Sequence, residues 1–149
     1  MIARAASATL LLALGAARAD PPAGARAEAA EWAVQAQPGA SGGPVVDLRV
    51  EARAGYHVNL EYPMAFLPSQ EATAKFPSAR MPLRPARTMP CPHDGKEVCA
   101  ATLELPYARP PAGATRVAGT LAFSVCSAEK CLIQKVPLSL AVASPPPRG

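Results

Sequence analysis

The sequence predicts an all-β protein, because short apolar segments that favour strands recur along it between turn signals. Residues 44–54 alternate apolar and charged side chains with the period of two that is typical of a strand with one buried face. No stretch has the clean apolar period of a long helix, and 18 prolines and 10 glycines divide the chain into short elements. About six to eight short strands with turns between them predict an immunoglobulin-like antiparallel β-sandwich.

The N-terminal segment has the pattern of a secretory signal peptide. Met1–Arg4 is short and basic, Ala8–Ala16 is apolar, and Ala17-Arg18-Ala19 places small residues where a signal peptidase requires them. We therefore expect residues 1–19 to be removed and the protein to be periplasmic or secreted. The apolar run is too short for a bilayer-spanning helix, so no membrane span is expected after cleavage; the alternative is an uncleaved N-terminal anchor.

The mature chain has room for one domain. Residues 20–30, rich in Ala, Pro and Gly, are expected to form a linker or a loosely held arm. Residues 31–143 are expected to form the sandwich, and residues 144–149 a proline-rich tail.

Charge and composition exclude several classes of function. Loss of Arg4 and Arg18 with the signal leaves 13 basic against 11 acidic residues, a net charge of +2. The basic residues are scattered and aromatics make up 5% of the chain, so no nucleic-acid partner is expected. The sequence has no Gly-rich phosphate loop and no recognisable Ser/His/Asp context, and no cofactor is expected.

The first elements follow from local pattern. Residues 28–35 form either a short helix or an edge strand, with Trp32 as a core anchor. In the strand at 44–54, apolar positions 46, 48 and 50 alternate with charged ones, and Gly55 ends it. Residues 56–59 resume in extended form, and the apolar run 64–67 predicts a further strand.

The second half holds the longest predicted strands. Six prolines in residues 68–92 indicate irregular strands and long surface loops. A turn at Asp94-Gly95 precedes a strand over 97–105. After a Pro- and Gly-rich connection, the β-favouring segments 115–125 and 132–143 predict two long strands.

Two cysteines stand in the loop between those last two strands. Cys126 and Cys131 are separated by four residues, and a chain that folds back over so short a distance brings its ends within reach of a disulfide. Four cysteines in an exported chain favour disulfides over thiols. A disulfide closing so short a loop stabilises a fold by only ~2 kcal/mol, against ~4 kcal/mol for one that ties Cys91 to this hairpin.

Two interpretations of the Cys126/Cys131 pair stay open. The pair is either an exchangeable, redox-active disulfide or a structural clip of the hairpin. Lys130 favours a thiolate at Cys131 and Glu129 opposes it, so the neighbouring charges do not decide between them.

A strand pair whose loop carries two close cysteines, followed by a Val-Pro-Leu step, resembles the N-terminal periplasmic domain of the thiol:disulfide interchange protein DsbD. The matching residues are Val125-Cys126, Cys131 and Val136-Pro137-Leu138, together with the upstream segment Gly55-Tyr56-His57-Val58-Asn59 and Tyr62-Pro63. The similarity covers about residues 30–143. The four-residue spacing between the cysteines is slightly shorter than we expect of the best-known members.

The resemblance implies a redox carrier. In that family the cysteine pair accepts electrons from a membrane-embedded domain and passes them to periplasmic oxidoreductases. Carried over, Cys126 and Cys131 are the catalytic pair, and the partners are exported thiol–disulfide oxidoreductases or a separate membrane electron donor. The competing classes are a non-catalytic secreted binding or structural module with inert disulfides and a Cu(I)-handling protein.

The other cysteines flank the predicted turn. A disulfide between Cys91 and Cys99 that staples this hairpin is the expected structural role. The copper alternative rests on soft ligands in one irregular segment, but no fixed-spacing motif supports it, and we expect no metal site; the candidate ligands are Met81, Met89, Cys91 and His93.

Three aromatic or imidazole side chains are candidate neighbours of the cysteine pair. His57 is either a proton shuttle near the thiols or an ordinary surface histidine. Tyr62 and Phe66 either cover the disulfide as a lid or pack in the core.

Overall fold

The computed structural model describes residues 25–143, which form ten β-strands. Their bounds are β1 Arg26–Glu28, β2 Trp32–Pro38, β3 Val45–Ala52, β4 His57–Val58, β5 Ala65–Pro68, β6 Met81–Pro82, β7 Pro85–Pro90, β8 Val98–Pro106, β9 Thr115–Cys126 and β10 Cys131–Val142. Within this range no helix is long and apolar enough to cross a membrane. The expected signal peptide and the proline-rich tail lie outside the described residues.

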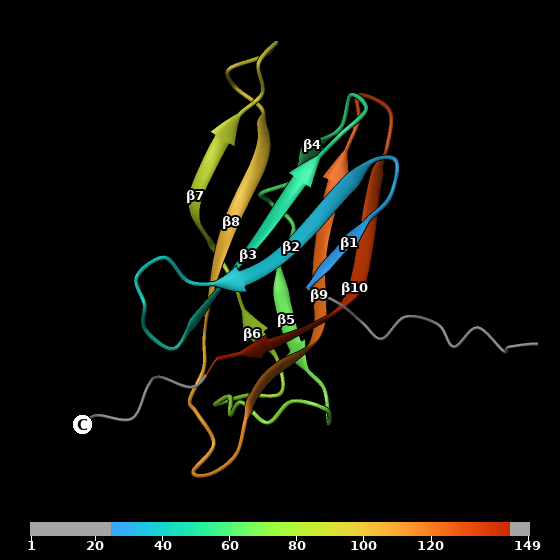
Figure 1. Ribbon diagram of the computed structural model, residues 1–149. Coiled ribbons are helices and arrows are strands. Elements are labelled where there is room, and N and C mark those ends of the chain that lie inside the picture. Colours follow the sequence, from blue (N-terminus) through green and yellow to red (C-terminus); the bar gives the residue numbers. More distant parts are fainter. Residues whose placement is uncertain (1–24, 144–149) are drawn as a thin grey trace, which may run out of the picture.

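The strands form two antiparallel sheets that pack face to face (Figure 1). The first sheet has the order β1-β2-β3-β8-β7, and the second has the order β10-β9-β5-β6, with β4 paired to β9 as well. The predicted fold class, an all-β antiparallel sandwich, is confirmed.

The core lies between the sheets and follows the alternation seen in the sequence. In β3, the alternate residues Val46, Leu48 and Val50 are at most 1% exposed. Trp32 of the first sheet meets Phe123 of the second edge to face, with ring centroids 5.4 Å apart and planes at 81°. Such a contact joins the two sheets through the largest side chains available.

One charged residue on the outer face of β3 is also buried. Asp47 is 3% exposed, and its Oδ2 accepts a hydrogen bond of 2.9 Å from Nη2 of Arg87 in β7. Arg87 also donates to Glu104 of β8 at 3.3 Å. The guanidinium thus ties three strands of the first sheet together, and it supplies the partner that a buried carboxylate requires.

The predicted linker differs from the structure where residues are described. Arg26–Glu28 is a strand that pairs with Ala33–Gln35, so this part of the segment 20–30 is an edge strand rather than a loosely held arm. Glu28 receives hydrogen bonds from Arg26 and Arg53, and these bonds, with the charge of the two arginines, lower the pKa of its exposed carboxyl group. The segment 28–35 contains the start of β2 and no helix, which settles that alternative in favour of a strand.

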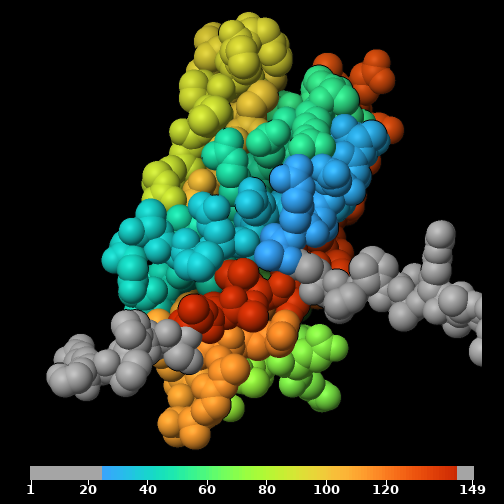
Figure 2. Space-filling model, in the orientation of Figure 1, coloured from blue at the N-terminus to red at the C-terminus, as the bar shows by residue number. Residues whose placement is uncertain are grey.

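Several turns gather at one end of the sandwich (Figure 1). They are the connections β3–β4, β7–β8 and β9–β10, and the tip of the β7–β8 hairpin protrudes there in the space-filling view (Figure 2). The two long strands β9 and β10 run the length of the second sheet to this end, where they place the Cys126/Cys131 pair.

Candidate functional site: a disulfide at the end of the sandwich

The β9–β10 hairpin sets the position of both cysteines. Its register pairs all twelve residues of each strand without interruption, from Thr115 with Val142 to Cys126 with Cys131. Beyond the cysteines, the Ser127 amide donates to the Lys130 carbonyl at 2.8 Å and closes a tight turn. The Ser127 hydroxyl accepts hydrogen bonds from the amides of Glu129 and Lys130, so the turn is held by its own side chain.

Cys126 and Cys131 form a disulfide, with Cα atoms 4.0 Å apart. The next pair outward, Ser127 and Lys130, is the hydrogen-bonded one, so the cysteines occupy a position of the closer, non-hydrogen-bonded kind. Direct cross-strand neighbours of this kind point to the same face of the sheet. The register alone therefore brings the two sulfur atoms together.

The two halves of this disulfide differ in access to solvent. Cys126 is 6% exposed, because β4 covers it from the side opposite to β10. Cys131 lies on the outer edge of the sheet and is exposed. An attacking group from outside therefore reaches the Cys131 sulfur more readily than the Cys126 sulfur.

β4 reaches the disulfide through a sharp turn after β3. Ala54 and Gly55 both have positive φ angles, of 53° and 80°, and glycine is the residue that adopts this region without steric cost. The turn returns the chain so that His57 pairs with Cys126 and Val58 with Val125. The His57 side chain therefore lies on the same face as the disulfide, while Val58 is buried in the core.

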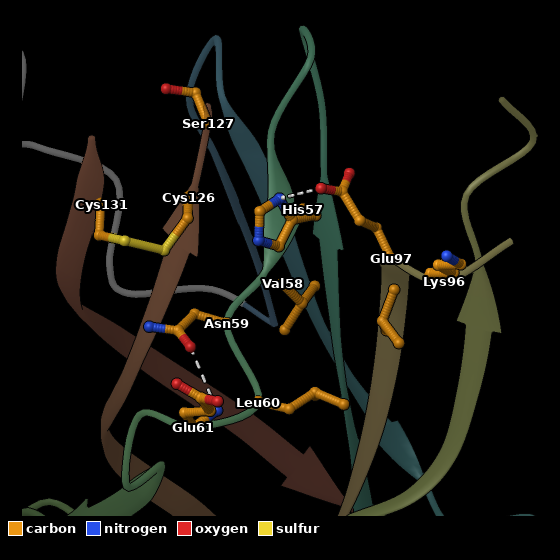
Figure 3. A pocket seen from close by; sticks show the side chains of 11 residues that line it. His57, Val58, Asn59, Leu60, Glu61, Lys96, Glu97, Cys126, Ser127 and Cys131 are labelled. Atoms are coloured by element: carbon orange, nitrogen blue, oxygen red, sulfur yellow. Dashed lines mark hydrogen bonds and ion pairs between the residues drawn. A yellow bond between two sulfur atoms is a disulfide. The ribbon is translucent and has the colours of Figure 1, made fainter. Parts of the chain in front are cut away.

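A pocket of about 500 Å³ opens beside the disulfide (Figure 3). Both cysteines line it, together with β4, the segment that follows β4, and the loop that leads into β8. The polar side chains of its wall include an imidazole, two carboxylates, an amide and an ammonium group: His57, Glu61, Glu97, Asn59 and Lys96. A sulfur–sulfur bond thus borders an open pocket with groups of both charges.

His57 is held by an acidic partner. Its Nδ1 lies 3.4 Å from Oε1 of Glu97, and the His57 side chain is 26% exposed. In Figure 3 the other ring nitrogen lies on the side toward the disulfide. A carboxylate on one ring nitrogen fixes the orientation of the imidazole, so the second nitrogen has a defined direction.

The three candidate neighbours named from the sequence separate in the structure. His57 lines the disulfide pocket. Phe66 is 1% exposed in the core, where its ring lies 5.8 Å from that of Phe76. Tyr62 is half-buried and lines a neighbouring pocket with Pro63 and Leu83, so neither aromatic ring is a lid on the disulfide.

The second cysteine pair forms the disulfide expected between its two members. Cys91 and Cys99 form a disulfide with Cα atoms 4.7 Å apart, and it closes the loop between β7 and β8. The predicted turn at Asp94-Gly95 lies inside this loop, where the Asp94 carboxylate accepts a hydrogen bond of 2.9 Å from the Lys96 amide.

The residues considered for copper do not form one site. The Cys91 sulfur is bonded to Cys99, Met81 is 8% exposed in the core, and Met89 is 53% exposed. Across residues 25–143, no three His, Cys, Asp or Glu side chains are grouped as metal ligands.

Sequence reasoning found His57 but not the groups around it. Lys96 and Glu97 lie some 30 residues before the cysteine pair, and only the β3–β8 pairing of the first sheet and the packing of β8 beneath β4 bring them close. The sequence signal that could locate Lys96 and Glu97 is the Cys91/Cys99 pair. A loop closed by a disulfide holds its side chains in a fixed position. Asn59 belongs to the segment 55–59 that the sequence singles out, and Glu61 lies two residues beyond its end.

Comparison with known proteins adds no relative. No family model matches the chain, and neither the curated proteins nor the solved structures contain a match. The fold and the site define the protein as an antiparallel β-sandwich with two disulfides, one of which borders an open polar pocket.

Proposed function

We propose that this protein is an exported redox carrier that exchanges electrons with other exported proteins through Cys126 and Cys131. This proposal draws on the resemblance to the N-terminal periplasmic domain of DsbD. The proposed partners are exported thiol–disulfide oxidoreductases or a separate membrane electron donor. All four cysteines are paired, which supports a periplasmic or secreted location, since disulfides persist in oxidising compartments.

The observation that carries the proposal is the asymmetric exposure of the disulfide beside the pocket. Thiol–disulfide exchange requires an attacking thiolate to approach one sulfur along the direction of the existing bond. Cys131 is exposed at the sheet edge, where a partner thiolate can reach its sulfur. The pocket leaves open space beside Cys126, whose sulfur is the leaving group. By contrast, Cys91 is 3% exposed and Cys99 is half-buried.

The exchange proceeds in two steps that conserve atoms and electrons. The thiolate of a partner dithiol attacks Sγ of Cys131, the bond between Cys126 and Cys131 breaks, and its electron pair stays on Sγ of Cys126. The second partner thiolate then attacks the partner sulfur of the mixed disulfide and releases Cys131 as a thiolate. Two electrons pass from partner to carrier, and the reverse sequence returns them to a second partner.

Selective reduction tests the proposal. Dithiothreitol is added to the folded protein, thiols are trapped at intervals, and the trapped cysteines are mapped by mass spectrometry. We expect Cys126 and Cys131 to be modified while Cys91 and Cys99 remain bonded, with the two rates differing by a factor on the order of 100 because of access.

The matched control is the same experiment in denaturant, where both disulfides are expected to open at similar rates. If neither disulfide opens until the protein unfolds, the protein is an inert binding or structural module and the redox proposal fails.

A further inference from the structure

We infer that His57, held by Glu97, is the proton-transfer residue for the Cys126 sulfur during exchange. This inference rests on the proposed function and names the group that handles the proton of the buried thiol. It also gives a role to the Cys91–Cys99 disulfide, which lies outside the reacting pair.

The register places the imidazole beside the sulfur that leaves. His57 pairs directly with Cys126 across β4 and β9, and direct cross-strand neighbours have Cβ atoms about 4.5–5.5 Å apart. Both residues line the same pocket. Cys126 is 6% exposed, so a thiolate formed there has little access to water and gains from a proton donor in the protein.

Glu97 orients the imidazole ring of His57. The contact of 3.4 Å occupies Nδ1, and the remaining ring nitrogen lies on the side toward the disulfide in Figure 3. Glu97 is therefore a positioning residue. With the Glu97 carboxylate beside Nδ1, Nε2 is the ring atom left to give a proton to the sulfur or take one from it.

The second disulfide holds Glu97 in place. The Cys91 amide donates a hydrogen bond of 2.8 Å to the Glu97 carbonyl, directly across the base of the β7–β8 loop. The bond between Cys91 and Cys99 closes the same loop. A loop fixed at its base keeps the Glu97 carboxylate within reach of β4, although it comes from the other sheet.

The proton moves from His57 to the sulfur that leaves. The partner thiolate bonds to Sγ of Cys131 while the Cys126–Cys131 bond breaks, and protonated His57 passes the proton on Nε2 to Sγ of Cys126. The products are the mixed disulfide, the Cys126 thiol and neutral His57 with its proton on Nδ1. In the reverse direction His57 takes the proton from the Cys126 thiol, which then attacks the mixed disulfide.

Other ionisable groups surround His57 and enter its pH response. Lys96 and Glu97 approach from the loop before β8, Glu61 from the segment after β4, and the two cysteines from β9 and β10. Tyr56 precedes it in the chain, and Arg53, at the start of the turn before β4, is within ion-pair distance of Glu28 and Glu51. Glu71 is an exposed carboxylate in the loop after β5 and does not line this pocket, which makes it a matched control for Glu97.

The test is the pH dependence of disulfide opening by dithiothreitol between pH 5 and 9, with each rate constant divided by the thiolate concentration of the reagent. In the wild type this normalised constant is expected to rise toward low pH. In His57→Gln it is expected to be flat, and at the acid end roughly 100-fold below the wild type, the lower end of the range for general acid catalysis. Glu97→Gln should flatten the profile in part, and Glu71→Gln should keep it.

A second variant, His57→Ala, separates the loss of the proton donor from a structural effect of the substitution. In His57→Ala, the open pocket leaves space for added imidazole, which should restore the acid-side acceleration. A profile in His57→Gln that follows the wild type, or no response of His57→Ala to imidazole, would overturn the assignment while the exchange function stands. A wild-type disulfide that does not open in the folded protein at any pH overturns both.

Discussion

Replacing Cys126 with serine is expected to leave Cys131 as an exposed thiol that captures disulfides rapidly. The reverse variant, Cys131→Ser, leaves its single thiol at a position that is 6% exposed beneath β4. Because a thiol must reach the sulfur it attacks, we expect Cys131 to react faster than Cys126 by a factor on the order of 100.

The measurement is the rate at which each folded variant reacts with a chromogenic aromatic disulfide and with oxidised glutathione. In denaturant the two variants should react at closely similar rates, which separates access from intrinsic reactivity. If Cys126 reacts as fast as Cys131 in the folded state, a partner has no preference for attack at Cys131, and the proposed order of steps is wrong.

Replacing Phe123 with alanine is expected to lower the free energy of unfolding by about 3–5 kcal/mol, the usual loss for a buried phenylalanine. Phe123 is fully buried and meets Trp32 edge to face, so truncation removes an aromatic contact that joins the two sheets. Urea unfolding with both disulfides intact gives the value, and Trp32, the single tryptophan, reports on it.

Phe76→Ala is the control for that variant. Phe76 is half-buried and packs on Phe66. Its loss should be clearly smaller than that of Phe123. A loss below about 1 kcal/mol for Phe123→Ala would mean that the sheets are not joined as the structure has them.

The strands with one buried face were predictable from the sequence because their side-chain period is local. Residues 44–54 alternated as a strand must, and the structure has β3 at Val45–Ala52. The two longest predicted strands, 115–125 and 132–143, correspond to β9 and β10 within one residue at each end. Nothing but the neighbouring residues is needed to fix such a pattern.

The elements that were missed depend on distant residues. β1 is a strand of three residues whose one partner within residues 25–143 is β2, and Glu28 is tied to Arg53, 25 residues away. Alanine-rich composition gives no local sign of such an edge strand. In the proline-rich region, β7 was expected only as an irregular strand, and its pairing with β8 does contain register shifts.

Only the part of the candidate site that depends on neighbouring residues could be predicted from the sequence. The spacing of Cys126 and Cys131 is a local signal, and their disulfide follows from the hairpin register. The approach of Glu97 to His57 depends on how β4 and β8, from different sheets, pack at the end of the sandwich. Tyr62 and Phe66 were named for their residue type alone, and the strand period at β5 turns Phe66 inward.

The reduction potential of the Cys126–Cys131 disulfide in the folded protein tests the central claim most directly. It is measured by equilibration with glutathione, thiol trapping and mass spectrometry. A redox carrier predicts a value above about −270 mV, within the range of known exchange proteins. A value below about −300 mV would identify a structural clip and contradict the proposed function.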